Sequence, residues 1–254
     1  MAIVAVTGDL VTTTSIALAL GWPTDDDPVV VEADPAGGDL AAWLDIPVHP
    51  SLSTVITRVA DGSWPEIEPF VRDTATGVKV IPLSPRAVEA ARSVAESARS
   101  VVVQMASPQA PTMIVDTGRL SPNPAAHPFV AAASVVVLVH RQTRHSNAAA
   151  AVRLQRLADQ VDLFASSPGH LVVAVVGNTP FSIDDISHFL ADTAGALPVI
   201  GLPYDELAAS VWAGRDGVSA RRANRLPLYR AGRDLALIVH RHLDDLIGSP
   251  GGSR

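Results

Sequence analysis

The first residues that could carry chemistry lie in the segment Thr7–Thr14, which joins one glycine to three consecutive threonines. A short apolar run, Ile3–Val6, precedes this segment, and a helix-forming stretch follows it. In nucleotide-binding α/β folds this is the place of a loop whose backbone N–H groups hold phosphate while a hydroxyl binds magnesium. Gly8, Thr12 and Thr13 are therefore candidate nucleotide-binding residues, and Thr12 is also a candidate magnesium ligand.

Polar residues also follow three later apolar runs. Asp34 comes shortly after the run Val29–Val31, Asp116 comes directly after Met113–Val115, and Asn178 follows a third run. An acid at the end of a strand is compatible with a nucleotide site, but it can equally cap the loop or helix that follows. Taken singly, the residues leave both interpretations open.

The apolar pattern predicts the elements that would position these residues. Runs that are continuously apolar indicate strands covered on both faces, and helix-forming stretches between them indicate parallel pairing. We therefore expect a doubly wound α/β fold, with a mostly parallel sheet of about seven strands and helices on both faces. The expected strands are Ile3–Val6, Val29–Val31, Val78–Ile81, Met113–Val115, Val135–Val139, Leu171–Val176 and Pro198–Leu202.

Helix-forming stretches rich in alanine, leucine, arginine and aspartate separate these strands. A proline-rich stretch, Ser121–Pro128, is expected to be a surface loop. We expect one domain over residues 1–247 and a flexible tail over residues 248–254. The expected helices are Thr13–Leu20, Leu40–Leu44, Ser53–Ala60, Pro85–Ala98, Ser146–Asp159, Ile183–Ala191, Asp205–Ala213 and Arg230–Ile247.

The order of these segments resembles the MinD/ParA group of P-loop ATPases, and the resemblance spans nearly the whole chain. The segment Glu32–Pro35 is similar to the acidic motif after that family's second strand, and Met113–Gly118 is similar to its Walker B strand. The resemblance implies that ATP and magnesium are the cofactors and that Asp34 serves the attacking water. It also implies that Asp116 lies on the magnesium side and that Asn178 contacts adenine.

The phosphate-binding loop departs from the family pattern. A working loop carries a glycine and a lysine directly before the threonines, and this family has a second lysine near the loop's start. Here Leu10 and Val11 stand at the glycine and lysine positions, Asp9 lies within the loop, and the chain's single lysine is Lys79. Loss of such a cation removes roughly a few kcal/mol of barrier stabilisation. We expect Asp9 to repel phosphate, Leu10 to crowd it, and ATP hydrolysis to be weak or lost.

An arginine from elsewhere is an alternative source of positive charge, because a guanidinium group grips phosphate through its planar fork. The candidates are Arg119, Arg141 and Arg144, each of which lies shortly after an apolar run. In this alternative the chain is an active ATP-dependent switch. Otherwise, these arginines belong to a solvated face.

Arginines crowd the C-terminal part of a chain whose net charge is −7. ParA-like proteins bind DNA non-specifically through basic surface on their later helices. This likeness makes Arg221, Arg222 and Arg225 candidate DNA contacts, and the alternative is a solvated helix face. The final helix, Arg230–Ile247, is expected to dock on the sheet, because charged residues interrupt the apolar face that a membrane-binding helix needs.

Composition and the resemblance together set the expected cellular role. The chain is 48% hydrophobic and has no cysteine, which fits a compact protein in a reducing compartment. Its N-terminus lacks signal-peptide features and no apolar run approaches the about 20 residues of a membrane span, so we expect a cytoplasmic protein, nucleoid- or pole-associated. The resemblance implies partitioning, division-site placement or polar placement of an apparatus. A damaged loop then predicts a pseudo-ATPase that acts through protein contacts, as a homodimer or with an intact relative.

Overall fold

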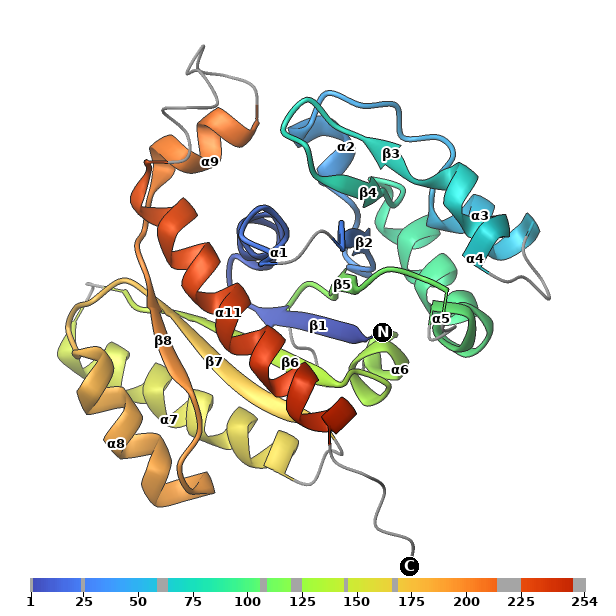
Figure 1. The fold of residues 1–254 in the computed structure, drawn as a ribbon. Helices are drawn as coiled ribbons and strands as arrows, with labels where there is room; N and C mark the ends of the chain where they lie inside the picture. Colours follow the sequence, from blue (N-terminus) through green and yellow to red (C-terminus); the bar gives the residue numbers. More distant parts are fainter. Residues whose placement is uncertain are drawn as a thin grey trace, which may run out of the picture.

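The computed structural model describes residues 2–23, 26–58, 64–105, 109–119, 125–143, 146–165, 169–213 and 225–248. Its centre is an eight-stranded sheet in the order β3-β4-β2-β5-β1-β6-β7-β8 (Figure 1). The pair β3–β4 is antiparallel and the other neighbouring strands are parallel. The strands are β1 Ile3–Gly8, β2 Val29–Glu32, β3 Arg72–Asp73, β4 Lys79–Ile81, β5 Met113–Asp116, β6 Val135–Arg141, β7 His170–Val176 and β8 Val199–Leu202.

Strand register gathers the candidate site at one edge of the sheet. In the pairing of β1 with β5, Val6 lies opposite Asp116, and in the pairing of β1 with β6, Gly8 lies opposite Val139. Glu32, the last residue of β2, lies opposite Asp116 on the other side of β5. The carboxyl ends of these parallel strands therefore meet, which is where ligands bind in open α/β sheets.

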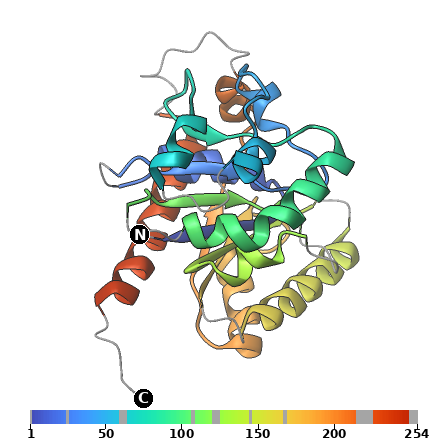
Figure 2. The ribbon, with the colours of Figure 1, turned by 90° about the vertical axis from the view of Figure 1, so that its right-hand side faces the viewer.

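Helices cover both faces of the sheet. Figure 1 shows α1 and α11 on one side and α7 and α8 on the other, and in the turned view of Figure 2 the red α11 and the yellow α7 again lie on opposite sides. The helices are α1 Val11–Leu20, α2 Leu40–Trp43, α3 Leu52–Arg58, α4 Trp64–Ile67, η1 Glu68–Phe70 (a 3₁₀ turn), α5 Ala87–Met105, α6 His127–Ala131, α7 Asn147–Ala165, α8 Ile183–Ala194, α9 Glu206–Trp212 and α11 Pro227–Gly248.

Two apolar cores result, one on each face. One lies between the sheet and α3, α5, α6, α7 and α8, and includes Phe129 and Leu157. The other lies between the sheet and α1, α2, α9 and α11, and includes Ile16 and Leu235. Helix α11 packs closely on α1, since a β-carbon at Gly232 would stand 2.6 Å from the Ala17 carbonyl oxygen. The last helix is thus docked, as its interrupted apolar face predicts.

The predicted doubly wound, mostly parallel fold is confirmed, with one strand more than the expected seven. The additional strand is β3, whose two polar residues give no apolar signal. Helix α6 is a second difference, because it begins inside the stretch that the sequence assigns to a loop, with a proline in its first turn, where no backbone N–H is needed. Gly248 belongs to α11 and not to the expected tail. No helix in the described part of the chain is long and apolar enough to span a membrane.

Candidate functional site

The loop between β1 and α1 turns sharply, and β6 holds its shape. Gly8 has a φ of +114°, and a β-carbon there would overlap the carbonyl oxygen of Val139. The backbone N–H of Asp9 donates to that same oxygen at 2.8 Å. Leu10 has φ 53° and ψ 37°, a left-handed conformation in which a residue with a β-carbon is strained. The loop therefore keeps a glycine-like turn at position 10 although leucine occupies it.

Thr12 and Asp116, the two predicted magnesium ligands, lie side by side. The hydroxyl of Thr12 donates to Asp116 Oδ2 at 2.7 Å, and the Gly118 N–H donates to Oδ1 at 3.0 Å. Burial raises the pKa of Asp116 to about 6, with the charges of Asp34 and Asp39 acting in the same direction. A hydroxyl and a carboxylate are suitable ligands for magnesium. Within the described residues, no group of three or more His, Cys, Asp or Glu is placed to hold a metal ion, so phosphate or water oxygens would have to complete the shell.

Replacing Thr12 by valine is expected to lower the free energy of unfolding by about 1–3 kcal/mol, because the buried carboxylate of Asp116 loses a hydrogen-bond donor. The matched control is Thr13→Val. Thr13 is half-buried and makes no side-chain hydrogen bond among the described residues, so its replacement should change stability by less than about 0.5 kcal/mol. Urea denaturation at pH 7 measures both. Equal losses of unfolding free energy in the two variants would show that the Thr12–Asp116 hydrogen bond makes no net contribution to stability.

Glu32, the first residue of the acidic motif Glu32–Pro35, organises the acidic loop through contacts that the sequence does not reveal. Its Oε1 accepts the N–H groups of Asp39 at 2.6 Å and Leu40 at 2.9 Å, and its Oε2 accepts that of Leu83 at 2.8 Å. The side chain is 1% exposed, and burial raises its pKa to about 7 despite these donors. Gly38 lies against it, since a β-carbon there would overlap Oε2. Glu32 thus ties the end of β2 to the start of α2 and to the segment after β4.

Asp34, the predicted catalytic residue, lies beside Asp116, but its hydrogen bond is made to the backbone of its own loop. Its Oδ1 accepts the Ala36 N–H at 2.8 Å, which is the loop-capping contact that the sequence leaves as an alternative. Its carboxyl also lies over Gly118, where a β-carbon would overlap it. Burial and the charge of Asp39 raise the pKa of Asp34, while the Ala36 hydrogen bond and the charge of Arg119 oppose this. The catalytic role of Asp34 stays a prediction.

Asp9 makes two contacts that the sequence does not predict. Its carboxylate accepts a hydrogen bond from the Arg141 N–H at 3.1 Å and forms an ion pair with Arg153 Nη2 at 2.7 Å, while its expected repulsion of phosphate stays a prediction. The loop nevertheless has no cation of its own. Lys79 lies at the opposite end of the sheet, at the start of β4, and pairs with Asp27 at 3.0 Å. Thr12 and Asp116 thus fit the magnesium side of a bound nucleotide, whereas the one described cation in an ion pair with the loop, Arg153, is held by Asp9.

The arginines proposed as substitutes for the missing lysine lie in different environments. The guanidinium of Arg141 lies over the ring of Tyr204, 4.6 Å from its centroid, and Arg119 is exposed after β5. Arg144 lies outside the described residues. Arg153, which the sequence analysis does not consider, contacts the loop instead. No sequence signal marks it, because it lies within a helix and the pairing spans 144 residues.

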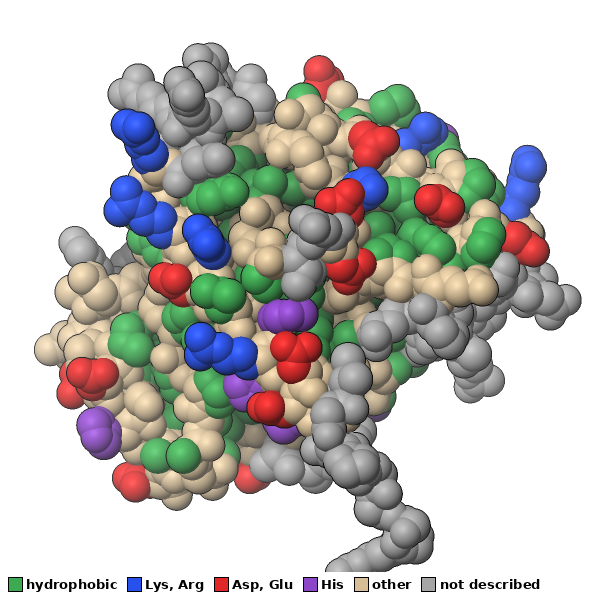
Figure 3. Space-filling model, in the orientation of Figure 1, with side chains coloured by type: hydrophobic (Ala, Val, Ile, Leu, Met, Phe, Trp, Pro, Cys, Tyr) green, Lys and Arg blue, Asp and Glu red, His purple; other side chains and the backbone are tan. Residues whose placement is uncertain are grey.

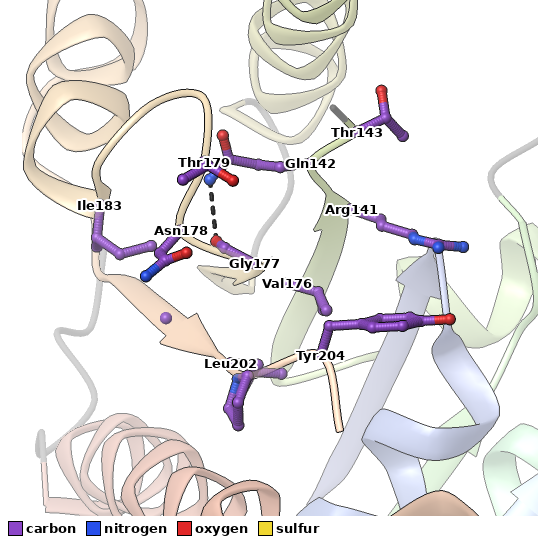
Figure 4. A pocket seen from close by; sticks show the side chains of 12 residues that line it. Arg141, Gln142, Thr143, Val176, Gly177, Asn178, Thr179, Ile183, Leu202 and Tyr204 are labelled. Carbon is purple, nitrogen blue, oxygen red and sulfur yellow. Dashed lines mark hydrogen bonds between the residues drawn. The ribbon is translucent and has the colours of Figure 1, made fainter. Parts of the chain in front are cut away.

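Asn178 lines an open pocket of about 750 Å³ beyond the carboxyl ends of β6, β7 and β8 (Figure 4). Arg141 and Tyr204 border one side of it, and the side-chain amide of Gln142 spans the loops by donating to the Gly177 carbonyl oxygen at 2.9 Å. Asn178 itself is exposed. Its proposed contact with adenine would require a base in this pocket, next to a loop whose contacting cation, Arg153, is paired with Asp9.

The basic C-terminal segment is described only in part. Arg221 and Arg222 lie outside the described residues, whereas Arg225 is exposed just before α11. Arg230, Arg233 and Arg241 are exposed along α11, and Figure 3 shows basic side chains over this helix interspersed with acidic ones. The visible surface is therefore of mixed charge.

Comparison with known proteins identifies the fold. No family model matches the sequence, and no curated protein matches it. MinD from Pyrococcus horikoshii, solved as its Mg-ADP complex, is 15% identical, with 97% of each chain covered and a TM-score of 0.67. A ParA family ATPase from Chlorobium tepidum is 15% identical over 93% of this chain and 97% of that one, with a TM-score of 0.68. MinD in the MinC:MinD complex of Aquifex aeolicus is 14% identical over 100% and 98%, with a TM-score of 0.63. The chain therefore has the fold of the MinD/ParA P-loop ATPases.

Proposed function

We propose that the protein is a MinD/ParA-like pseudo-ATPase that acts in spatial organisation through protein contacts, with ATP hydrolysis weak or lost. One observation carries this proposal: the β1–α1 loop turns at a left-handed Leu10 just before α1, but the cation that contacts it, Arg153, is paired with Asp9 of the same loop. Charge on a transferring phosphoryl group is stabilised mainly by cations placed in advance. A loop that neutralises its neighbouring cation lacks that stabilisation.

We expect such a molecule to act by binding other proteins. The structurally similar MinD of Aquifex aeolicus has been solved with its partner MinC, so this fold supports assembly with another protein. We propose that this chain likewise works with a partner, as a homodimer or with an intact relative. We further propose partitioning, division-site placement or polar placement of an apparatus as the process. In the cell, a fluorescent fusion should concentrate on the nucleoid, at midcell or at a pole, and uniform fluorescence would count against this role.

Purified wild-type protein is expected to show no heat of binding for MgATP or MgADP at millimolar concentration, and no phosphate release above a buffer blank. Isothermal titration calorimetry and a phosphate-release assay measure these quantities. The control is Asp116→Ala, which removes the buried carboxylate beside Thr12. If wild type binds MgATP and the variant does not, the site is functional and the pseudo-ATPase proposal fails.

A nucleotide switch is the first alternative, and it would depend on Asp34, Asp116 and an arginine. This alternative predicts magnesium-dependent ATP hydrolysis that the replacement Asp34→Ala abolishes. The exposed Arg225, together with the three exposed arginines of α11, supports a second alternative, a DNA-associated adaptor. That adaptor would bind duplex DNA with an affinity that falls steeply with salt and on replacement of Arg221, Arg222 and Arg225.

A further inference from the structure

The Asp9–Arg153 pair joins the β1–α1 loop to α7. Arg153 Nη2 lies 2.7 Å from Asp9 Oδ2, and it also donates to the carbonyl oxygen of Arg141 at 3.2 Å. The two side chains are 35% and 33% exposed, so water screens the pair less than it would a fully exposed one. Among the described residues, Arg153 is the one basic side chain that forms an ion pair with this loop.

Arg153 keeps unused capacity to bind an anion. A guanidinium group offers five N–H donors in a planar fork, and Asp9 engages a single nitrogen. The Nε of Arg153 is shielded from solvent and has no hydrogen-bond partner. The neighbouring His140 does not share the positive charge at neutral pH, because burial, and then the charge of Arg153, lower the pKa of His140 to about 4.

The start of α1 has few polar contacts of its own. Its first turn contains no acidic residue, and Leu10 at the N-cap makes no side-chain cap, although Asp116 on β5 accepts the hydroxyl of Thr12. Free N–H groups at a helix start favour negative charge. Asp9 is the acid that the loop itself contributes, and its carboxylate neutralises the adjacent cation, Arg153.

We propose that the Asp9–Arg153 ion pair is an autoinhibitory contact, in which the loop's own carboxylate holds the guanidinium that would otherwise bind a phosphoryl anion. This inference rests on the proposed pseudo-ATPase function and gives its cause. It predicts that anion binding is latent in the loop and is restored by neutralising one side chain.

The test compares wild type with Asp9→Asn, Arg153→Gln and the double variant Asp9→Asn/Arg153→Gln. Asparagine keeps the size of the side chain and an oxygen that can accept the Arg141 N–H, so it removes mainly the charge. Calorimetric titration uses inorganic pyrophosphate and MgADP as separate probes at low and high salt. Pyrophosphate reports on the loop, whereas additional affinity for MgADP would report on the pocket lined by Asn178. Thermal denaturation confirms that each variant is folded.

Asp9→Asn is expected to bind pyrophosphate at least about tenfold more tightly than wild type, with an affinity that falls as salt rises, and the double variant should lose this gain. A folded Asp9→Asn that gains nothing overturns the proposal, and so does a gain that survives in the double variant. Asp9→Ser replaces Asp9→Asn if the latter does not fold. If neither folds, the ion pair is a structural requirement and the proposal fails. MgATP binding by wild type would instead refute the pseudo-ATPase function itself.

Discussion

Replacing Glu32 by alanine is expected to lower the free energy of unfolding by about 3 kcal/mol or more. Three backbone N–H groups donate to this buried carboxyl, and each donor left without a partner costs about 1–3 kcal/mol. These donors belong to Asp39, Leu40 and Leu83, so the loss should loosen the acidic loop that carries Asp34. Urea denaturation measures the loss, and Glu66→Ala on α4, where the glutamate is exposed, is the matched control. Similar values for the two variants would contradict the organising role of Glu32.

The effect of pH gives this prediction a second readout. Because the pKa of Glu32 is raised to about 7 in the folded protein, the folded state binds a proton more tightly than the unfolded state does. Stability due to this group is therefore fully present below its ordinary pKa and declines as pH rises to about 7, at most by about 1.4 kcal/mol per pH unit. In the alanine variant this contribution is absent. The stability difference between the two proteins should thus be largest near pH 5 and smaller at pH 8.

The sequence predicted the sheet well because its central strands contain unbroken apolar runs rich in β-branched residues. Val29–Val31 and Val135–Val139 are buried as expected. The same signal fails at β3, where the polar residues Arg72 and Asp73 pair with β4 at the edge of the sheet and neither is fully buried. Edge pairing of this kind depends on the neighbouring strand and leaves no periodicity in the sequence.

The sequence located the acids of the candidate site but did not predict their contacts. Thr12 and Asp116 come together because β1 and β5 are adjacent and in register, which follows from the order of the strands. The sequence placed Glu32 in the acidic motif but did not reveal its contacts. Two of its donors, Asp39 and Leu40, come from the loop that follows, and the third, Leu83, lies 51 residues away. The ion pair of Asp9 was not predicted for a related reason: the left-handed turn at Leu10 and the position of α7 decide where its side chain lies.

Gly8→Ala is expected to lower the free energy of unfolding by about 4 kcal/mol or more, or to prevent folding. Two costs combine at this position. A φ of +114° is unfavourable for alanine, and the new β-carbon would overlap the carbonyl oxygen of Val139 on the neighbouring strand. That oxygen accepts the Asp9 N–H at 2.8 Å, so relief of the overlap would break the hydrogen bond that holds the loop on β6.

Gly77→Ala separates these two costs. Gly77 also has a left-handed conformation, with a φ of +85°, but nothing lies within 4 Å of the place where its β-carbon would stand. Its replacement should therefore cost only the conformational strain, about 1 kcal/mol. Urea denaturation measures the free energy of unfolding of both variants. The difference between their two losses gives the cost of the overlap with Val139. If the two losses are equal, strain alone explains Gly8, and close packing against β6 does not hold the loop in shape. If Gly8→Ala costs far more, the contact with β6 maintains the turn of a loop in which Leu10 and Val11 precede the threonines.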